Sequence, residues 1–147
     1  MPEKIACELC AEPGGDLLWE DAVCRVVRVT DPTAAEFPGF CRVIWRRHVA
    51  EMSDLSPNDA HHVLDVLLAT ERAVRRTVHP DKINLASLGN VVPHLHWHVI
   101  PRWQDDSRFP APIWAGAQRA AIERRASEHA MLRSALETEL STRNEMP

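Results

Sequence analysis

The stretch Val92-Pro93-His94-Leu95-His96-Trp97-His98-Val99-Ile100-Pro101 places three histidines at every second position. Side chains of a β-strand alternate between its two faces. We therefore expect His94, His96 and His98 to project from one face of a strand, while the apolar residues between them enter a core on the other face. Three imidazoles on one face suggest chemistry, because histidine titrates near neutral pH and can act as a nucleophile, a proton carrier or a metal ligand.

Two other interpretations of the three histidines remain open. They could be unrelated strand residues on a solvated face, although strict alternation with apolar neighbours disfavours this. They could also hold a catalytic metal ion through two or three imidazoles. The stretch contains no carboxylate, and Pro93 and Pro101 flank it, so this second interpretation is also disfavoured.

The composition is that of an ordinary globular protein. The chain has 147 residues, about the length of one domain, and can bury a core. Its formal net charge of −4 argues against binding long nucleic acid through general phosphate neutralisation. The sequence has no apolar run that could span a bilayer, and residues 1–4 lack the pattern of a secretory signal. We therefore expect a cytoplasmic protein in which Cys24 and Cys41, which lie in apolar stretches, are reduced core residues.

Four more strands and one long helix are expected around the histidine stretch. The expected strands are residues 17–20, 24–29, 40–45 and 82–88. The first two of these strands form a plausible hairpin. Ser56 can cap a helix whose first turn contains Pro57 and Asp59. Apolar residues then keep helical spacing as far as Val78.

The residues that follow Arg102 begin with a loop rich in proline and tryptophan. Trp103 and Trp114 could line a base pocket, but loop tryptophans more often cover a core edge or a dimer contact. A charged segment from about Ala117 to Leu140 predicts one helix, which packs on the body or on a second subunit.

Three arginines near the expected site are predicted to be solvated charges rather than phosphate ligands. They are Arg46, Arg47 and Arg102, of which Arg102 leaves the histidine strand close to the site.

These residues resemble the histidine triad (HIT) superfamily of nucleotide hydrolases and transferases. The resemblance rests on the three histidines with their apolar spacers, on the preceding Gly89-Asn90 and on the strand that carries Asn84. It extends to Val29-Thr30-Asp31 and to residues 38–48, and it covers roughly residues 7–102. Within the superfamily, the sequence looks most like the bacterial branch of dinucleoside polyphosphate hydrolases.

The resemblance implies an α+β fold, a HIT-like antiparallel sheet of about five strands with one main helix and a C-terminal helix. Residues 1–107 would form the HIT-like nucleotide-binding domain. Residues 108–147 would form a C-terminal loop and helix that extend the same domain. The resemblance also implies a homodimer.

The same resemblance implies nucleotidyl chemistry. In the superfamily the middle histidine attacks the α-phosphorus of a nucleotide ester, anhydride or phosphoramidate, and water then releases the mononucleotide from a covalent nucleotidyl-histidine. By position His96 would be the nucleophile, His98 a donor to a phosphate oxygen and His94 an orienting group. A neutral imidazole can attack at pH 7 when its other nitrogen donates a hydrogen bond. Positioning and charge stabilisation then carry the reaction, so no cofactor is required for catalysis.

The resemblance assigns substrate contacts outside the three histidines. Backbone N–H groups of Gly89 and Asn90, with the amides of Asn84 and Asn90, would donate to phosphate oxygens. Asp31 would accept hydrogen bonds from ribose hydroxyls. Asn84 could instead serve a strand edge, and Asp31 could be a turn former before Pro32. The expected ligand is a purine nucleotide or nucleotide conjugate, and neither a long nucleic acid nor a membrane is an expected partner.

Two positions depart from the superfamily pattern. Phe40 stands where many relatives have a histidine, and Val91 stands where hydrolytic relatives often have a hydroxyl that contacts the phosphate or leaving group. A dinucleoside polyphosphate or another conjugate is therefore at least as suitable a substrate as a phosphoramidate. The departures also motivate an alternative function, a nucleotide-binding regulatory protein with little or no turnover.

The segment Cys7-Glu8-Leu9-Cys10 has the spacing of a metal knuckle or a redox pair. Some bacterial relatives and the related hexose-phosphate uridylyltransferases hold a structural zinc ion through residues that correspond to Cys7, Cys10, His48 and His94. Two thiolates and two imidazoles form a suitable tetrahedral zinc set. Two inert thiols remain the alternative, whereas a redox pair is disfavoured because no strand precedes the motif.

Overall fold

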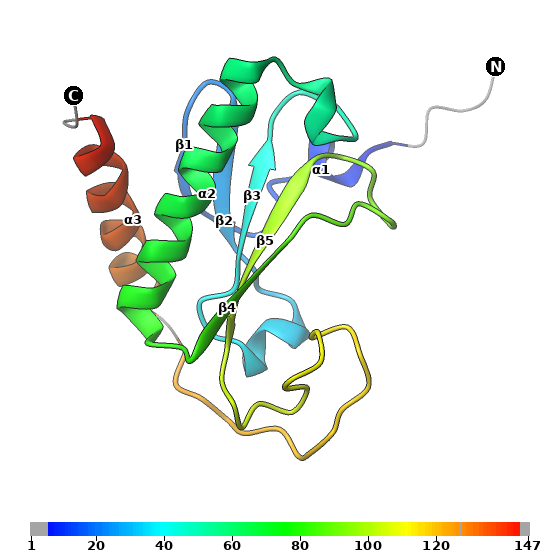
Figure 1. Ribbon diagram of the computed structural model, residues 1–147, viewed down its shortest axis with the longest axis vertical. Helices are drawn as coiled ribbons and strands as arrows, with labels where there is room; N and C mark the ends of the chain where they lie inside the picture. The colour runs from blue at the N-terminus through cyan, green and yellow to red at the C-terminus, as the bar shows by residue number, and fades with distance from the viewer. Residues whose placement is uncertain (1–5, 127, 145–147) are drawn as a thin grey trace.

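The strands of the protein form one antiparallel sheet, shown in Figure 1. The computed structural model describes residues 6–126 and 128–144. The sheet contains β1 (Asp16–Glu20), β2 (Cys24–Arg28), β3 (Cys41–Trp45), β4 (Lys82–Ala86) and β5 (His96–Arg102). Their spatial order is β1-β2-β3-β5-β4, and every neighbouring pair is antiparallel. The expected α+β class and five-stranded sheet are confirmed.

The hairpin between β1 and β2 is closed by Asp21. Its Oδ1 atom accepts hydrogen bonds from the backbone N–H groups of Val23, at 2.9 Å, and of Cys24, at 2.8 Å. A short acidic side chain that satisfies two backbone donors stabilises a tight turn. The expected hairpin is confirmed.

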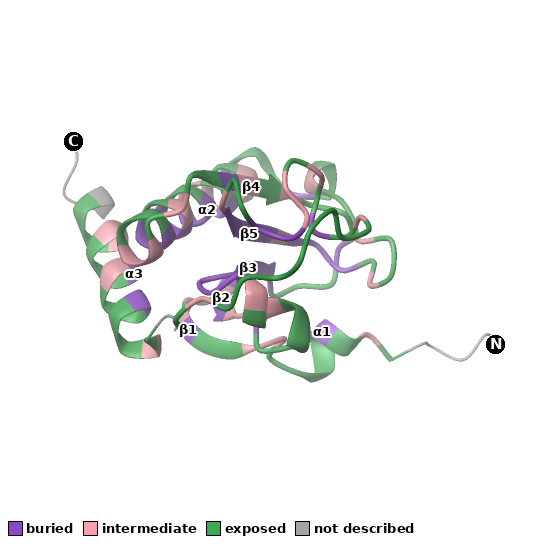
Figure 2. Cartoon of the chain, turned by 90° about the horizontal axis from the view of Figure 1, so that it is seen from below, coloured by how far each residue is buried: buried purple, intermediate pink, exposed green. Residues whose placement is uncertain are grey.

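The main helix, α2 (Pro57–Val78), begins and ends where local chemistry requires. The hydroxyl of Ser56 accepts a hydrogen bond from the backbone N–H of Asp59 at 3.2 Å, which is the expected N-cap. His79 follows the helix in the left-handed conformation. The buried residues of α2 recur at helical spacing and are Val63, Val66, Leu67, Ala69, Thr70, Ala73 and Val74. This face packs on the sheet, as the buried residues between α2 and the strands in Figure 2 show.

The opposite face of the sheet is covered near one end by α1 (Glu8–Ala11). Leu9 of α1 packs with Val27 and Ile44 in a small buried cluster. Arg25 of β2 holds the same segment through its guanidinium, which donates to the carbonyl oxygens of Leu9 at 2.8 Å and of Pro13 at 2.9 Å. The N-terminal segment is therefore docked on the face of the sheet that lies away from α2.

Strand β5 alternates as the sequence predicts. Leu95 and Val99 are buried in the main core with α2, and Trp97 packs against that core. His96 and His98 lie on the other face, because Ile44 and Arg42 are their direct partners on β3. The strand begins at His96, so His94 lies in the bend just before it.

The C-terminal helix α3 (His129–Asn144) is shorter than expected, since residues 117–126 are not helical. The prediction of a helix from Ala117 is wrong for a tertiary reason. The backbone N–H of Gln118 donates to Ser107, and Arg119 donates to the carbonyl oxygens of Asp106 and Phe109. These contacts hold the segment extended along the preceding loop. Leu132 and Leu136 of α3 then enter the main core beside α2.

The remaining helical turns are short. They are the 3-10 helices η1 (Pro32–Glu36) and η2 (Met52–Asp54). Asp31 caps η1, because its side chain accepts a hydrogen bond from the backbone N–H of Thr33 at 3.1 Å. Nowhere in residues 6–126 and 128–144 is there a helix with the length and apolar character needed to cross a bilayer.

Candidate active site

The three histidines gather at one end of β5. His94 is fully buried, and His96 and His98 are 8% and 7% exposed. The rings of His96 and His98 meet edge to face, with centroids 5.0 Å apart. His94 instead contacts His48, with ring centroids 5.1 Å apart. The histidines therefore divide into a pair that faces a pocket and a third member that faces the N-terminal segment.

The pocket beside His96 and His98 has a volume of about 770 Å³. Its walls include the expected residues Asp31, Gly89 and Asn90. They also include Arg42 and Trp114. Arg42 was not predicted from the sequence, although strand alternation between Cys41 and Val43 already places it on the face away from the core.

The hydrogen bond of His96 fixes which of its nitrogens can react. Its Nδ1 atom lies 2.5 Å from the carbonyl oxygen of His94. A carbonyl oxygen only accepts, so Nδ1 carries the proton and Nε2 carries the lone pair. Burial lowers the pKa of His96, and nearby Arg42 lowers it further, against the opposing hydrogen bond to His94. The ring is therefore a neutral imidazole with one nitrogen available for attack.

His98 lies between two aromatic side chains. Its ring centroid is 5.8 Å from that of Phe40 and 5.2 Å from that of Trp114. Burial, with help from the nearby His96 and Arg42, lowers the pKa of His98 to about 4. Its Nδ1 atom is buried and has no hydrogen-bond partner within the described chain. His98 is therefore a neutral ring with a polar atom left for a ligand or an ordered water.

Arg42 supplies positive charge at the pocket. Its guanidinium donates to the carbonyl oxygen of Gly14 at 2.9 Å and forms a 3.4 Å ion pair with Asp31. The same guanidinium lies over the ring of Phe40, 5.9 Å from its centroid. A cation beside two neutral imidazoles suits an anionic group of a ligand.

The loop between β4 and β5 forms another side of the pocket. Gly89 adopts a positive φ of 70°, a conformation that glycine takes without strain. Asn90 and Val91 follow it, and Val91 is 93% exposed. The rim of the pocket at Val91 therefore presents methyl groups, which neither donate nor accept a hydrogen bond.

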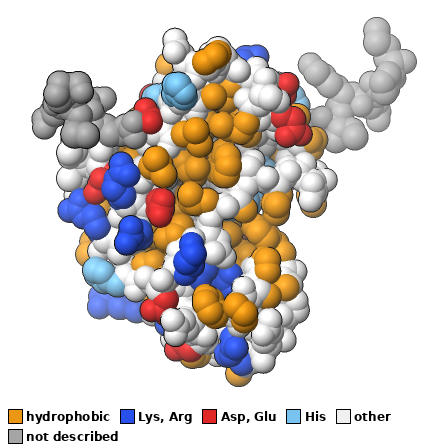
Figure 3. Space-filling model, viewed as in Figure 1, with side chains coloured by type: hydrophobic (Ala, Val, Ile, Leu, Met, Phe, Trp, Pro, Cys, Tyr) orange, Lys and Arg blue, Asp and Glu red, His pale blue; other side chains and the backbone are white. Residues whose placement is uncertain are grey.

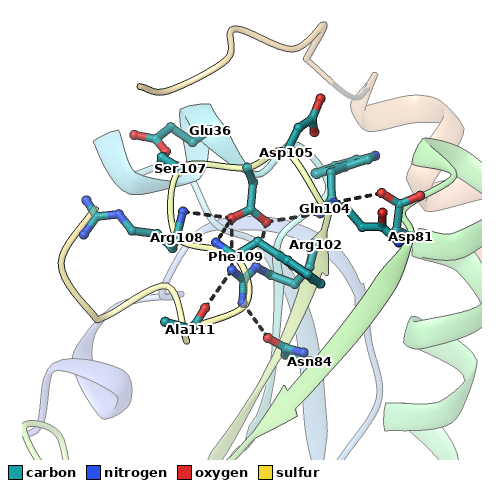
Figure 4. Close-up of polar contacts among 12 residues, drawn as sticks. Glu36, Asp81, Asn84, Arg102, Gln104, Asp105, Ser107, Arg108, Phe109 and Ala111 are labelled. Atoms are coloured by element: carbon teal, nitrogen blue, oxygen red, sulfur yellow. Dashed lines mark hydrogen bonds and ion pairs between the residues drawn. The ribbon is translucent and has the colours of Figure 1, made fainter. Parts of the chain in front are cut away.

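Asn84 lies outside this pocket wall and contacts Arg102, as Figure 4 shows. The expectation that Arg102 is a solvated charge is wrong, since it is only 1% exposed. Its guanidinium donates to Asn84 Oδ1 at 2.8 Å, to the carbonyl oxygen of Ala111 at 2.8 Å and to both carboxylate oxygens of Asp106 at 2.9 and 3.0 Å. Arg102 is buried because loop residues 103–115 fold over the end of β5 and supply Asp106 and Ala111, while β4 supplies Asn84.

Asp106 organises that loop. Its carboxylate also accepts hydrogen bonds from the backbone N–H groups of Trp103, Arg108 and Phe109 at 2.8 to 3.1 Å. Burial raises the pKa of Asp106, but the hydrogen bonds from Arg102 and from the backbone outweigh this and hold the pKa below its usual value. The loop is therefore built around a buried and fully paired ion pair.

A second cluster beside the pocket contains metal-binding side chains. Cys7, Cys10, His48 and His94 offer four ligand atoms that all lie within 4.8 Å of one another. The Nδ1 atom of His94 is 3.3 Å from the sulfur of Cys7 and 3.5 Å from that of Cys10, and Cys10 is 3.5 Å from the Nδ1 atom of His48. In a tetrahedral zinc site with Zn–N near 2.05 Å and Zn–S near 2.3 Å, ligand atoms are about 3.3–3.8 Å apart. The donor set and its spacing fit a zinc ion.

The orientation of His94 also fits a metal ligand. Its Nε2 atom lies 2.6 Å from the carbonyl oxygen of Trp45, so Nε2 donates and Nδ1 faces the two thiols with a lone pair. Metal-bound histidines in proteins are commonly held in this way by a carbonyl behind the ring. The single helical turn of α1 brings the two cysteines together, because the N–H of Cys10 donates to the carbonyl of Cys7 at 3.1 Å.

Cys24, Cys41, Arg46 and Arg47 lie in the environments that the sequence predicts. Cys24 and Cys41 are completely buried, as expected, and no disulfide forms among the four cysteines, all of which lie in the described part of the chain. Arg46 and Arg47 are exposed, as expected.

Known proteins resemble the chain in both sequence and fold. The HIT domain family matches residues 12–105. AP-4-A phosphorylase of Mycobacterium tuberculosis is 28% identical over 78 residues, which cover 49% of this chain and 40% of that protein. The chain therefore aligns with less than half of the length of this curated relative.

Solved structures that resemble most of the chain include two histidine triad proteins. A histidine triad protein from Bradyrhizobium japonicum is 28% identical with a TM-score of 0.66, and the match covers 84% of this chain and 90% of that one. A histidine triad protein from Marinobacter aquaeolei is 26% identical with a TM-score of 0.68, and the match covers 92% of this chain and 94% of that one.

Proposed function

Because the chain belongs to the HIT domain family, we propose that it is a nucleotide hydrolase or nucleotidyltransferase that cleaves nucleotide conjugates at the α-phosphate. The reaction passes through a covalent nucleotidyl-histidine on His96. The observation that carries this proposal is the hydrogen bond from His96 Nδ1 to the carbonyl of His94, which leaves Nε2 as the nucleophilic atom of a pocket residue.

The proposed reaction has two balanced steps. In the first, His96 Nε2 bonds to the α-phosphorus while the bond from phosphorus to the leaving group breaks, and the leaving group takes a proton from solvent. In the second, water adds to phosphorus, the N–P bond breaks and a proton is released with the mononucleotide. The carbonyl of His94 stabilises the positive charge that develops on the ring in the first step, because it accepts the Nδ1 proton.

Other pocket residues serve the phosphate and the sugar in this proposal. Arg42 offsets the negative charge of the phosphate, and the backbone of Gly89 and Asn90 offers neutral donors to its oxygens. Asp31 accepts hydrogen bonds from ribose hydroxyls with the carboxylate that it also offers to Arg42. His98 donates to a phosphate oxygen. Asn84 takes part only indirectly, through its bond to Arg102.

A dinucleoside polyphosphate is the proposed substrate class. The likeness to AP-4-A phosphorylase supports this class, although that likeness covers half of the chain. The exposed methyl groups of Val91 offer no hydrogen bond to a leaving group, which disfavours a phosphoramidate. A purine base is the proposed nucleobase.

A zinc ion is proposed to have a structural role. Cys7, Cys10, His48 and His94 would hold it, and the closed set of four protein ligands leaves no position for substrate. When bound, the ion would tie the N-terminal segment to the residue that accepts the Nδ1 proton of His96. Catalysis itself uses the chain's own side chains.

A nucleotide-binding regulatory protein with little turnover is the second candidate function. Phe40 is buried against His98 and offers it no hydrogen bond, and Val91 offers none at the rim. These two residues favour binding without efficient departure of the leaving group.

We also propose a homodimer. The edge strand β4 has a free side in the described chain, and it carries the exposed Leu85, while α2 carries the exposed Leu64 and Leu68. Figure 3 shows hydrophobic side chains gathered on this side of the molecule. Such an area is typical of a protein contact surface. Sedimentation velocity at several concentrations checks this proposal, and a monomer at all concentrations contradicts it.

Intact-mass spectrometry tests the proposed function. The wild-type protein is mixed briefly with diadenosine tetraphosphate, diguanosine tetraphosphate or adenosine 5′-phosphoramidate and then quenched in base, where phosphohistidine survives. A mass increase of one nucleotidyl group, absent from His96→Ala, supports the proposal and identifies the donor. Release of no mononucleotide and no adduct, with nucleotide binding equal in both proteins, supports the regulatory protein instead.

A further inference from the structure

Trp114 is a large aromatic side chain held half-exposed at the candidate active site. It is 51% exposed and forms part of the wall of the pocket that contains His96 and His98. Its ring meets His98 nearly at a right angle, with centroids 5.2 Å apart and an interplanar angle of 71°. In an edge contact of this kind, His98 covers at most one face of the indole. At least one face remains for another ring.

The exposure of Trp114 does not come from a loosely held segment. Before it, the carbonyl oxygen of Ala111 accepts a hydrogen bond from buried Arg102 at 2.8 Å. After it, the backbone N–H of Ala115 donates to Pro112 at 3.0 Å, and Arg108 donates to the carbonyl oxygen of Ala115. The backbone is therefore held on both sides of the tryptophan.

The core does not need the indole either. The neighbouring Ile113 is 4% exposed and fills a small apolar cluster with Phe37, Phe40 and Ile100. Trp114 itself is not part of this cluster. Trp114 instead lines the pocket that contains His96 and His98, where it forms an apolar wall.

We propose that Trp114 is a stacking subsite that binds a planar ring of the substrate, either the nucleobase or an aromatic leaving group. This inference rests on the proposed function for the identity of the ligand as a nucleotide conjugate. The pocket offers a different partner to each part of such a ligand. Arg42 and the histidines would contact the phosphate, and the indole of Trp114 would stack on a ring. Stacking on an aromatic side chain tolerates any base, because every base has a π face. Its loss lowers affinity by about tenfold.

Four phosphonate ligands can show whether the stacked ring is the nucleobase or the leaving group. In each, a stable phosphorus–carbon bond replaces the bond from phosphorus to the leaving group. They are the 5′-methylphosphonate and 5′-phenylphosphonate of adenosine, and the same two phosphonates of 1-O-methylribose. All four carry one negative charge, so they differ only in the presence of adenine and of phenyl. Their dissociation constants are measured by calorimetry for the wild type, Trp114→Leu and Trp114→Phe. Trp103→Leu is the matched control, because Trp103 packs on Arg124 and lies outside this pocket wall.

The expected result is a loss of affinity that depends on a ring. Trp114→Leu weakens both adenosine ligands about tenfold if adenine is the stacked ring, or both phenyl ligands if the leaving group is. The ligand with neither ring binds as in the wild type, Trp114→Phe recovers most of the loss, and Trp103→Leu changes nothing. Equal weakening of all four ligands, or of none, overturns the inference. An equal loss of affinity for all four ligands, together with a change in the mass of the protein in solution, also overturns it. Trp114 would then belong to a contact between subunits.

Direct binding keeps this test separate from the proposed function. The phosphonates need no turnover, so a ring-dependent loss supports the subsite even if His96 forms no adduct. Conversely, an adduct on His96 with ring-independent binding leaves the proposed function intact and removes the stacking role from Trp114.

Discussion

The Nδ1 atoms of His48 and His94 lie 3.2 Å apart and face each other across the two thiols of the N-terminal segment. The Nε2 atom of His94 donates to the carbonyl oxygen of Trp45, so the facing Nδ1 atom of the neutral ring is an acceptor. Two imidazole nitrogens and two sulfurs that converge in this way are better arranged to bind a common cation than to hydrogen-bond with one another.

The double substitution Cys7→Ser with Cys10→Ser should remove a bound metal. We expect one zinc ion per chain in protein purified without chelators and less than about a tenth of that in the variant, because thiolates supply half of the ligands. The melting temperature should fall as well, since metal binding stabilises the folded state. Elemental analysis and calorimetry provide both measurements. Cys41→Ala is the control, and zinc that is absent from the wild type or retained by the double variant contradicts the site.

His96→Ala should abolish turnover of any nucleotide conjugate that the wild type cleaves. The expected loss of kcat is at least about a thousandfold, because the variant lacks the nucleophile. His61→Ala, which changes an exposed histidine of α2, should retain full activity. Steady-state release of mononucleotide measures both variants, and a His96→Ala protein with more than a tenth of wild-type activity would exclude covalent catalysis by this residue.

Arg42→Gln should weaken binding of anionic ligands. A charge-assisted contact with phosphate is typically worth about 1.5–3 kcal/mol, so KM should rise by about tenfold or more. Arg47→Gln removes the same charge from an exposed position outside the pocket wall and should leave KM unchanged. An equal rise in KM for the two variants would mean that only net charge matters, and an unchanged KM for Arg42→Gln would contradict the contact.

Asp106→Ala should destabilise the fold strongly. It leaves the buried guanidinium of Arg102 without its carboxylate partner, and loss of one member of a buried pair costs about 3–5 kcal/mol. Asp105→Ala is the matched control, because Asp105 is an exposed neighbour whose ion pair among the described residues is with Arg124. Urea unfolding compares the two proteins, and a loss below about 1 kcal/mol for Asp106→Ala would show that the pair contributes little.

Acid should weaken the protein through the same carboxylate. The pKa of Asp106 is lower in the folded state than in the unfolded chain, where an aspartate has a pKa near 3.9. The unfolded state therefore binds the proton first as the pH falls. The stabilisation that the Asp106 carboxylate contributes is complete above about pH 5. It is lost progressively as the pH falls below about 4 and through the folded-state pKa. Unfolding free energies measured from pH 6 to pH 3 should decline less steeply for Asp106→Asn, and parallel curves would contradict this role.

Local patterns predicted the elements of the fold well. The alternation around His96 and the cap at Ser56 correctly predicted a strand and a helix, because both depend on neighbouring residues. The helix expected from Ala117 failed, since contacts with residues 105–109 hold residues 117–126 extended. Propensity does not register such competition from distant backbone groups.

The environments of individual side chains could not be predicted from the sequence, because they depend on the folded chain. Arg102 was expected in solvent, because its position in the sequence does not show that the loop directly after β5 folds back over its side chain and supplies Asp106 and Ala111 as partners. Arg42 was missed because its neighbour His98 is 56 positions away in the sequence and becomes its direct partner only through the register of β3 and β5.

The sequence by itself determined the division of β5 into a histidine face and an apolar face, because side-chain alternation is a property of the strand alone. It also supplied residue types that suit the proposed zinc site and the proposed nucleotidyl transfer. Only the tertiary structure decided how the histidines divide, with His94 turned toward Cys7 and Cys10 and His96 turned toward the pocket. The physical reason is that these roles depend on hydrogen bonds and donor distances between segments far apart in the chain, which pairing of the strands sets.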